Sequence, residues 1–294
     1  MPEPTTNPEL TVIVTTRDRA DLIDEGLAAL AEQEWDGDWD VVFVDNDSND
    51  HTIEVLERWA DKMPVPARIV VETAGHGPSW ARNAGVAATA ATSVAFVDDD
   101  DVVGTGWVAA IAEALRDHDL VGSRHDFALL NPPELAATRS NQLDELGRFH
   151  GVRVVSGGGL GCRRALWELA GGSNPDFRTG QDIDFALRVA RVAEPRTTLA
   201  ADARYHMRLR SGARSAFEQG ERFGRAWVRL HAEHRDVATG PTLSPRDWAR
   251  RWVALAFRMR RLGDPVQRIR WSFDVGYELG RLRGAIRYRT WAAV

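Results

Sequence analysis

The first 125 residues alternate short apolar segments with amphipathic ones, and this alternation constrains the fold more than any other feature of the chain. The apolar segments are rich in β-branched residues and predict strands over residues 10–15, 40–44, 67–71, 93–97 and 119–123. The segments between them have helical periodicity, over residues 21–34, 52–60, 79–91 and 106–116. This order predicts an α/β fold, with a mostly parallel, Rossmann-like central sheet and helices on both faces.

Polar residues follow three of the predicted strands. They are the segments Thr15–Arg17, Asp45–Asp47 and Asp98–Asp101. In open parallel sheets, ligands bind beyond the carboxyl ends of the strands. Each segment alone could be a solvated turn, but three together indicate one binding crevice.

Four adjacent carboxylates, Asp98 to Asp101, end the fourth strand. Such charges repel one another unless a cation neutralises them, and Mg²⁺ or Mn²⁺ usually takes one or two carboxylates together with substrate phosphates. We therefore expect Mn²⁺ or Mg²⁺ as a cofactor and a nucleoside diphosphate as part of the substrate. The alternative is a phosphatase of the haloacid dehalogenase type, which also has two aspartates after an apolar strand. That chemistry ordinarily needs a downstream lysine, whereas the only lysine, Lys62, lies upstream.

Five segments resemble, in order and spacing, the family 2 glycosyltransferases of the GT-A fold. They are VIVTTRDRADLIDEGLAAL, VVFVDNDSNDHT, HGPSWARNAGVAATAATSVAFVDDDDVV, SGGGLGCRRALWELAGG and TGQDIDFALR. The resemblance covers roughly residues 9–210. It implies an inverting enzyme that moves a sugar from a nucleotide-diphosphate donor to an acceptor hydroxyl or other nucleophile, with a UDP-sugar as the most frequent donor in the family.

The resemblance also assigns roles to individual residues. Asp45 matches the acid that reads the nucleobase, and Asp100 matches the metal ligand of the Asp-x-Asp pair. His206 falls where some members supply a late histidine to the metal or the diphosphate. The remaining donor-binding residues that we expect are Thr15, Arg17, Arg82, Asn83, Asp98 and Asp99.

Asp182 matches the general base of the family's Glu-Asp motif, although Gln181 stands where Glu is more usual. Direct displacement at a sugar carbon needs a base near the acceptor. The residues alone favour a helix-capping role for both Asp182 and Asp184 over a catalytic one. The resemblance favours Asp182 as the base and leaves Asp184 to capping or acceptor contact. The glycines of the 156–161 segment either let backbone approach a ligand or form a tight turn.

The C-terminal part of the chain is basic and aromatic. Residues 204–294 hold 20 arginines and 8 acidic residues, and they predict helices near 216–235, 245–261 and 266–289. We expect a GT-A catalytic domain over residues 1–214, with a donor half at 9–125 and an acceptor half at 126–214, and a helical extension over 215–294. The extension could contact an anionic membrane surface, a charged acceptor or a second copy of the chain, or pack its aromatic residues on the catalytic domain.

Features that the sequence lacks exclude some kinds of site and indicate where the protein is located. The chain has one cysteine, Cys162, which excludes intrachain disulfides and multi-cysteine metal sites. No binding motif for nucleic acid is present. The start lacks a signal peptide, so we expect a cytoplasmic protein, with peripheral contact at the inner face of the membrane as an alternative. Rival functions are a sugar-nucleotide pyrophosphorylase or other nucleotidyltransferase, and a non-catalytic sugar-nucleotide-binding protein.

Overall fold

The computed structural model describes residues 7–139, 145–240 and 244–290. The chain forms two compact units. The first holds the described residues of Met1–Asp126, Leu143–Gly147 and Arg153–Met207, and the second those of Phe127–Gln142, Arg148–Val152 and Arg208–Val294.

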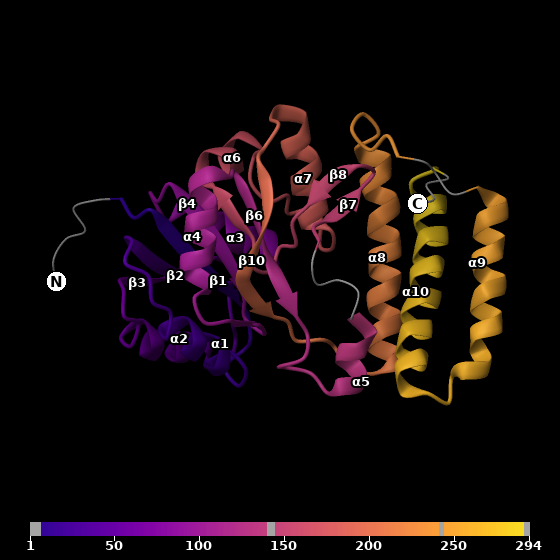
Figure 1. Cartoon of the computed structure of the whole chain (residues 1–294), viewed down its shortest axis with the longest axis horizontal. Coiled ribbons are helices and arrows are strands. Elements are labelled where there is room, and N and C mark those ends of the chain that lie inside the picture. The colour runs from indigo at the N-terminus through magenta and orange to yellow at the C-terminus, as the bar shows by residue number, and fades with distance from the viewer. Residues whose placement is uncertain (1–6, 140–144, 241–243, 291–294) are drawn as a thin grey trace. The chain divides into compact units, whose positions relative to one another are not determined.

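The first unit is built on an eight-stranded sheet, with the strand order β3-β2-β1-β4-β9-β6-β10-β5 (Figure 1). The strands are β1 (Leu10–Thr16), β2 (Trp39–Asp45), β3 (Ala67–Val71), β4 (Ser93–Asp98), β5 (Val102–Val103), β6 (Leu120–Asp126), β9 (Gly161–Arg163) and β10 (Thr197–His206). The helices are α1 (Asp24–Ala31), α2 (Thr52–Ala60), α3 (Pro78–Ala87), α4 (Trp107–Asp117), α6 (Arg164–Leu169) and α7 (Gln181–Val192).

The side chains of β1 alternate between the two faces of this sheet and so between two apolar clusters. Val12 and Val14 pack with α1, α2 and α4, whereas Ile13 packs with α3, α6 and α7. Successive strand residues point to opposite faces. A strand covered on both sides is therefore apolar at consecutive positions, as this one is.

The predicted α/β fold is confirmed, including the parallel pairing of β3, β2, β1 and β4. Each predicted strand and helix of the first 125 residues is present, with shifts at the ends. The sequence did not predict β9, which runs antiparallel between β4 and β6, or β10, which pairs with β6. The three residues of β9 are too few to carry a periodicity, and β10 contains alanines and charged residues instead of the apolar run that predicts a buried strand.

The second unit consists mainly of helices. They are α5 (Pro133–Ala136), the 3-10 turn η1 (Ala137–Arg139), α8 (Ala213–Glu233), α9 (Pro245–Arg258), the 3-10 turn η2 (Met259–Arg261) and α10 (Pro265–Arg287). The short strands β7 (Gly147–Phe149) and β8 (Val152–Val154) pair with each other. No helix in the described ranges is both long and apolar enough to cross a membrane.

Local signals place the starts of α9 and α10. Ser244 accepts a hydrogen bond from the Asp247 backbone N–H, and Asp264 accepts bonds from the Val266 and Gln267 N–H groups. Each capping residue is followed by proline, which lacks an N–H and has the dihedral angle of a first helical position. These signals explain why the helices begin within one residue of the positions predicted.

Helices α8 and α10 lie side by side in the second unit (Figure 1) and approach closely at glycines. A Cβ atom added to Gly220 of α8 would lie 2.1 Å from the carbonyl oxygen of Phe273, and one added to Gly276 of α10 would lie 2.1 Å from that of Phe217. The same holds for Gly224 and Gly280, one turn further along. Small residues at four-residue spacing let helix backbones touch.

The two compact units do not coincide with the predicted domains, whose boundaries stay a prediction. The boundary at residue 207 is near the predicted one at 214, but residues 127–139 and 148–152, which we assigned to the acceptor half, belong to the compact unit of the C-terminal helices. Arg139 lies over the ring of Phe273, for example, with its guanidinium carbon 5.1 Å from the ring centroid. Contacts between residues so far apart in sequence leave no local signal.

Candidate active site

Three strand ends meet at one edge of the sheet in the first unit. In the register of the parallel strands, Thr15 of β1 lies opposite Asp98 of β4, and Thr16 lies opposite Asp45 of β2. Thr15, Thr16 and Asp45 are buried. A carboxylate therefore lies on either side of the end of β1, as the polar segments predicted.

Hydrogen bonds connect the loop after β1 to the segment after β2. Asp50 accepts a hydrogen bond from the Ala20 backbone N–H at 3.1 Å, and Thr52 Oγ1 accepts one from the Arg19 N–H at 2.8 Å. These bonds hold the first loop, in which the Arg17 side chain is 36% exposed. A ligand beyond the strands would meet Arg17 on a loop whose backbone is already fixed.

Asp45 is fully buried, and only one of its oxygens is paired. Oδ2 accepts a hydrogen bond from the Ser48 backbone N–H at 3.0 Å, whereas Oδ1 has no hydrogen-bond partner among the described residues. A buried acceptor without a partner is unfavourable unless a ligand supplies the donor. The vacant acceptor fits the predicted contact with the N–H of a nucleobase, which stays a prediction.

Asp98 links the end of β4 to α3 and β10. Its Oδ1 accepts a hydrogen bond from Arg82 Nη2 at 2.8 Å, and its backbone N–H donates to the hydroxyl oxygen of Tyr205 at 2.9 Å. Tyr205 is fully buried, and burial raises the pKa of its hydroxyl well above the usual value. The neutral hydroxyl and the Arg82 cation together orient the first aspartate of the Asp-x-Asp pair.

Asp99 points to the first loop. Its Oδ2 accepts a hydrogen bond from the Arg17 backbone N–H at 3.3 Å, and its Oδ1 pairs with Arg19 Nε at 3.4 Å. Burial raises the pKa of Asp99 to about 6, while the Arg19 charge opposes that shift. These contacts make Asp99 a residue that positions the predicted donor loop, and its direct contact with the donor stays a prediction.

Arg82 pairs with one carboxylate and lines the same small cavity as another. It is 8% exposed, pairs with Asp98, and its charge lowers the pKa of Asp182. The backbone of Gly157 lies against the guanidinium, and a Cβ there would be 2.7 Å from Arg82 Nη1. At Gly157 the absence of a side chain therefore allows close packing of backbone on Arg82, and the two predicted explanations, approach to a ligand and a tight turn, stay predictions.

Asp182 is the second residue of α7 and lies beside a small cavity. Its Oδ1 accepts a hydrogen bond from the Ile183 backbone N–H at 2.9 Å. Burial raises the pKa of its carboxyl, partly opposed by this bond and by Arg82. The cavity measures about 10 Å³ and is lined by Arg82, Gln181 and Asp182 among others, so it has room for about one water-sized group.

Asp184 and Asn83 have structural contacts. Asp184 is 1% exposed and pairs with Arg188 one helical turn later at 2.8 Å, and its predicted role in capping or acceptor contact stays a prediction. Both polar groups of the Asn83 side chain bond to the backbone of Ser173, each at 2.8 Å. These contacts hold the turn that follows α6, and the predicted place of Asn83 in the donor pocket stays a prediction.

The pairing of β5 with β10 brings the segment that contains Asp100 to the strand that ends in His206. Asp100 lies in the turn before β5, and Val102 of β5 pairs with His206 of β10. His206 Nδ1 lies 3.7 Å from Asp126 Oδ2. In the described part of the chain, no three His, Cys, Asp or Glu side chains gather into a metal-binding group. The oxygen and imidazole ligands fit a divalent cation only if substrate phosphates complete its coordination, as Mg²⁺ sites commonly require.

Sequence reasoning missed two residues that shape this site. Tyr205 had no assigned role, and nothing local distinguishes a strand-end tyrosine that accepts a hydrogen bond from another strand. Asn46 was noted only as polar, but its side chain bonds to the carbonyls of Glu72 and Gly75 and to the N–H of Gly77. An asparagine directly after a buried strand was the available signal.

Comparison with known proteins identifies the family. The profile described as Glycosyl transferase family 2 matches residues 11–168, more than half of the chain. The chain belongs to this family. The resemblance of the five segments is thereby confirmed, and the pyrophosphorylase and phosphatase alternatives are set aside.

Curated relatives share only part of their length with the chain. An uncharacterized glycosyltransferase, EpsJ of Bacillus subtilis, is 29% identical over 201 residues, which cover 64% of this chain and 57% of that protein. The poly(ribitol-phosphate) beta-N-acetylglucosaminyltransferase TarS of Staphylococcus aureus is 30% identical over 111 residues, or 37% of this chain and 19% of TarS. The chain therefore spans less than two thirds of the length of either relative.

Solved structures share the fold at low identity. The mannosyltransferase PcManGT of Pyrobaculum calidifontis, in complex with GDP-Man and Mn²⁺, has a TM-score of 0.63 at 20% identity, over 96% of this chain and 89% of that one. A fragment of S. aureus TarS in complex with UDP-GlcNAc has a TM-score of 0.55 at 16% identity, over 96% and 92% of the two chains. These likenesses confirm the predicted GT-A fold.

Proposed function

We propose that this protein is an inverting, metal-dependent glycosyltransferase that moves a sugar from a nucleoside diphosphate donor to an acceptor hydroxyl, with Asp182 as the general base. Family membership supports sugar transfer, and nucleotide sugars are bound by the structural neighbours PcManGT and TarS. A UDP-sugar is the proposed donor, on its frequency in the family.

One observation carries this proposal: Arg82, which pairs with Asp98 Oδ1 at the end of β4 at 2.8 Å, lines the same small cavity as Asp182 at the start of α7. The two motifs lie 84 residues apart in sequence. A buried cation that is shared by the Asp98 pair and the cavity of Asp182 supports one site in which the donor side and the acceptor side are adjacent. Structural capping alone gives no reason for such a link.

In the proposed reaction, Asp182 accepts the proton of the acceptor hydroxyl while the hydroxyl oxygen bonds to the anomeric carbon of the sugar. The bond from that carbon to the diphosphate oxygen breaks on the opposite face, and the nucleoside diphosphate leaves with the electron pair. Burial raises the pKa of Asp182, which makes its carboxylate a better proton acceptor than an exposed aspartate.

The leaving diphosphate needs positive charge. Asp100 and His206 would hold the Mn²⁺ or Mg²⁺, which when bound supplies that charge to the phosphate oxygens. Asp45 would bind the nucleobase through its unpaired oxygen, and Arg17 would contact the base from the first loop. Asp98, held by Arg82, would face the ribose or the sugar.

The C-terminal helices suggest a peripheral contact with anionic membranes. Helix α9 exposes Val253 and Phe257 (57% and 61%) close to the exposed arginines Arg250 and Arg260. Apolar side chains flanked by arginines suit the interface of an anionic bilayer. The charge favours a lipid surface over a second copy of this chain, since two such faces would repel each other.

Substitution of Asp182 by Asn tests the proposed base. Asn keeps the shape and can still accept the bond from Ile183, but it cannot take a proton. We expect single-turnover sugar transfer at saturating donor to fall by roughly 10²- to 10⁴-fold. Nucleotide affinity should change little, because Asp45 and Asp100 are retained. The melting temperature should stay level or rise, since burial disfavours the Asp182 charge.

Asp184→Asn is the matched control at the same helix start. Its carboxylate pairs with Arg188 in a buried environment, so this variant should lose stability and keep transfer per folded molecule. Full transfer by Asp182→Asn would show that another group is the base. Nucleotide binding without transfer by the wild-type protein, over a panel of donors and acceptors, would favour the non-catalytic alternative.

A further inference from the structure

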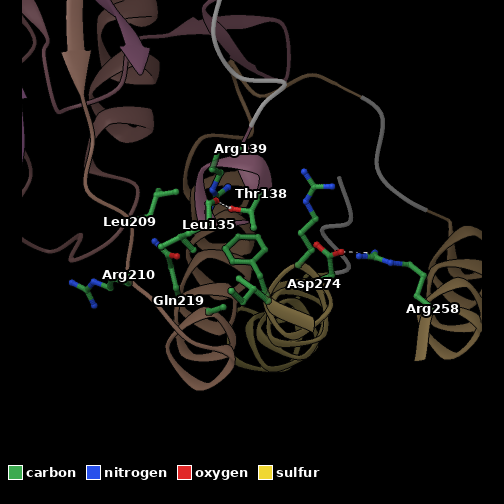
Figure 2. Close-up of a pocket in the computed structure, with 12 residues that line it drawn as sticks. Leu135, Thr138, Arg139, Leu209, Arg210, Gln219, Arg258 and Asp274 are labelled. Carbon is green, nitrogen blue, oxygen red and sulfur yellow. Dashed lines mark hydrogen bonds and ion pairs between the residues drawn. The ribbon is translucent and has the colours of Figure 1, made fainter. Parts of the chain in front are cut away.

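The second unit contains a cavity of about 390 Å³ (Figure 2). We propose that this cavity binds the phosphate group of a phosphate ester. Its lining comes from segments far apart in sequence: the turn η1, residues 209–210, and the helices α8, α9 and α10. The site is separate from the candidate nucleotide site, which lies in the first unit.

The described lining carries four arginines and one carboxylate. The arginines are Arg139, Arg210, Arg258 and Arg270, and the carboxylate is Asp274. Asp274 is already engaged by Arg258 at 2.5 Å, an ion pair drawn in Figure 2. The Arg270 guanidinium donates to the carbonyl oxygen of Ala137, which neutralises no charge. The cavity therefore has an excess of positive charge.

Arg139 has the position of an anion ligand. It is partly buried, and its guanidinium carbon lies 5.1 Å from the centroid of the Phe273 ring. Burial lowers its pKa, and the nearby positive charge of Arg270 lowers it further, with Asp274 opposing. A guanidinium stacked on a ring keeps its edge donors available, and arginine binds phosphate oxygens with two parallel N–H bonds. An added dianion would relieve the repulsion between Arg139 and Arg270.

The rest of the lining indicates what the phosphate is attached to. Leu135, Ala216, Ile269 and Phe273 are apolar, and Gln219 adds a polar amide. A cavity of this volume is at the lower end of the range for small-molecule sites, and it has room for more than an inorganic ion. A phosphate ester with a short organic group matches both the charge and the apolar walls. Arg210, which points away from the cavity centre in Figure 2, would meet whatever extends outside.

The phosphate ester could come from a lipid or from a polyol, and two probes distinguish these sources. Hexyl phosphate represents the lipid and glycerol 3-phosphate the polyol. Each is titrated by calorimetry into the whole protein at low salt, with inorganic phosphate for comparison. We expect at least one ester to bind more tightly than inorganic phosphate, and the tighter ester identifies the source. No probe contains a nucleotide or a sugar donor, so this result is independent of sugar transfer.

Arg139→Gln should weaken binding of that ester by about tenfold or more, because it removes a charge-assisted pair of hydrogen bonds. Arg268→Gln is the matched control: it removes the same charge from α10 at an exposed position that does not line the cavity. Its affinity should stay within about twofold. If Arg139→Gln lowers the melting temperature sharply, Arg270→Gln tests the second cavity arginine in the same way. Absence of ester binding by the wild-type protein, or an equal loss in Arg268→Gln, would overturn the proposal.

Discussion

Replacing Gly220 by alanine should separate α8 from α10. The new Cβ would lie 2.1 Å from the Phe273 carbonyl oxygen and 2.9 Å from the Tyr277 nitrogen, where about 3.4 Å is the start of ordinary contact. The helices must therefore move apart by about 1.3 Å at this point. Both obstructing atoms belong to the main chain, so no side-chain rotation relieves the overlap.

The loss of stability follows from two opposing contributions. Overpacking of a well-packed interface costs typically 1–3 kcal/mol, and rigid main-chain contacts favour the upper end of that range. Alanine in place of glycine within a helix returns about 0.5–1 kcal/mol, because the unfolded chain has less freedom to lose. The difference is about 2 kcal/mol. The entropy of unfolding is about 2.1 cal/mol/K per residue, so for a chain of 294 residues the melting temperature should fall by about 3 °C.

Thermal unfolding followed by circular dichroism measures this change. Gly263→Ala is the control: a Cβ there meets nothing within 4 Å, so its melting temperature should stay level or rise slightly. Since Phe273 also lines the phosphate cavity, Gly220→Ala should weaken ester binding as well. A melting temperature of Gly220→Ala equal to that of the wild type would refute the close helix contact.

Three further predictions concern the metal, the pH response and α9. Asp100→Ala should weaken Mn²⁺-dependent nucleotide binding by at least about tenfold, measured by calorimetry with metal and with chelator; unchanged affinity in both would remove Asp100 from the metal site. His150 Nε2 lies 3.1 Å from His231 Nδ1, and burial lowers the pKa of both, while mutual repulsion also lowers that of His150. The folded protein then binds fewer protons than the unfolded chain. The contribution of the two histidines to the free energy of unfolding is therefore complete above about pH 6.5, and it declines as the pH falls through their lowered pKa values in the folded state. Melting temperatures from pH 8 to 5 should fall less steeply in His150→Gln, and parallel curves would contradict this reasoning. Phe257→Ser should reduce co-sedimentation with vesicles of phosphatidylglycerol at low salt by about tenfold, because the variant loses an aromatic side chain that would be partly buried in the bilayer interface. Equal binding would exclude α9 as the membrane contact, and loss of a dimer in the variant would assign this face to self-association.

The fold could be predicted well wherever the signal was local. The β-branched run of β1 and the capping residues Ser244 and Asp264 mark elements whose positions the structure reproduces. Strands such as β9 could not be predicted, because their burial depends on the strands that flank them rather than on their own periodicity. The predicted metal-binding role of Asp100 and the proton-accepting role of Asp182 rest on the family motifs and remain to be measured.

The amino-acid sequence was sufficient to predict the order of strands and helices over the first 125 residues, the family, and the gathering of Asp45 and Asp98 at one edge of a parallel sheet, because side-chain periodicity and strand ends are properties of neighbouring residues. The partner of each carboxylate became clear from the folded structure alone. Asp184 pairs with Arg188, whereas Arg82 pairs with Asp98 and lines the same small cavity as Asp182. Burial and the partner across the fold set the charge and the pKa of each carboxylate, and both depend on residues distant in sequence.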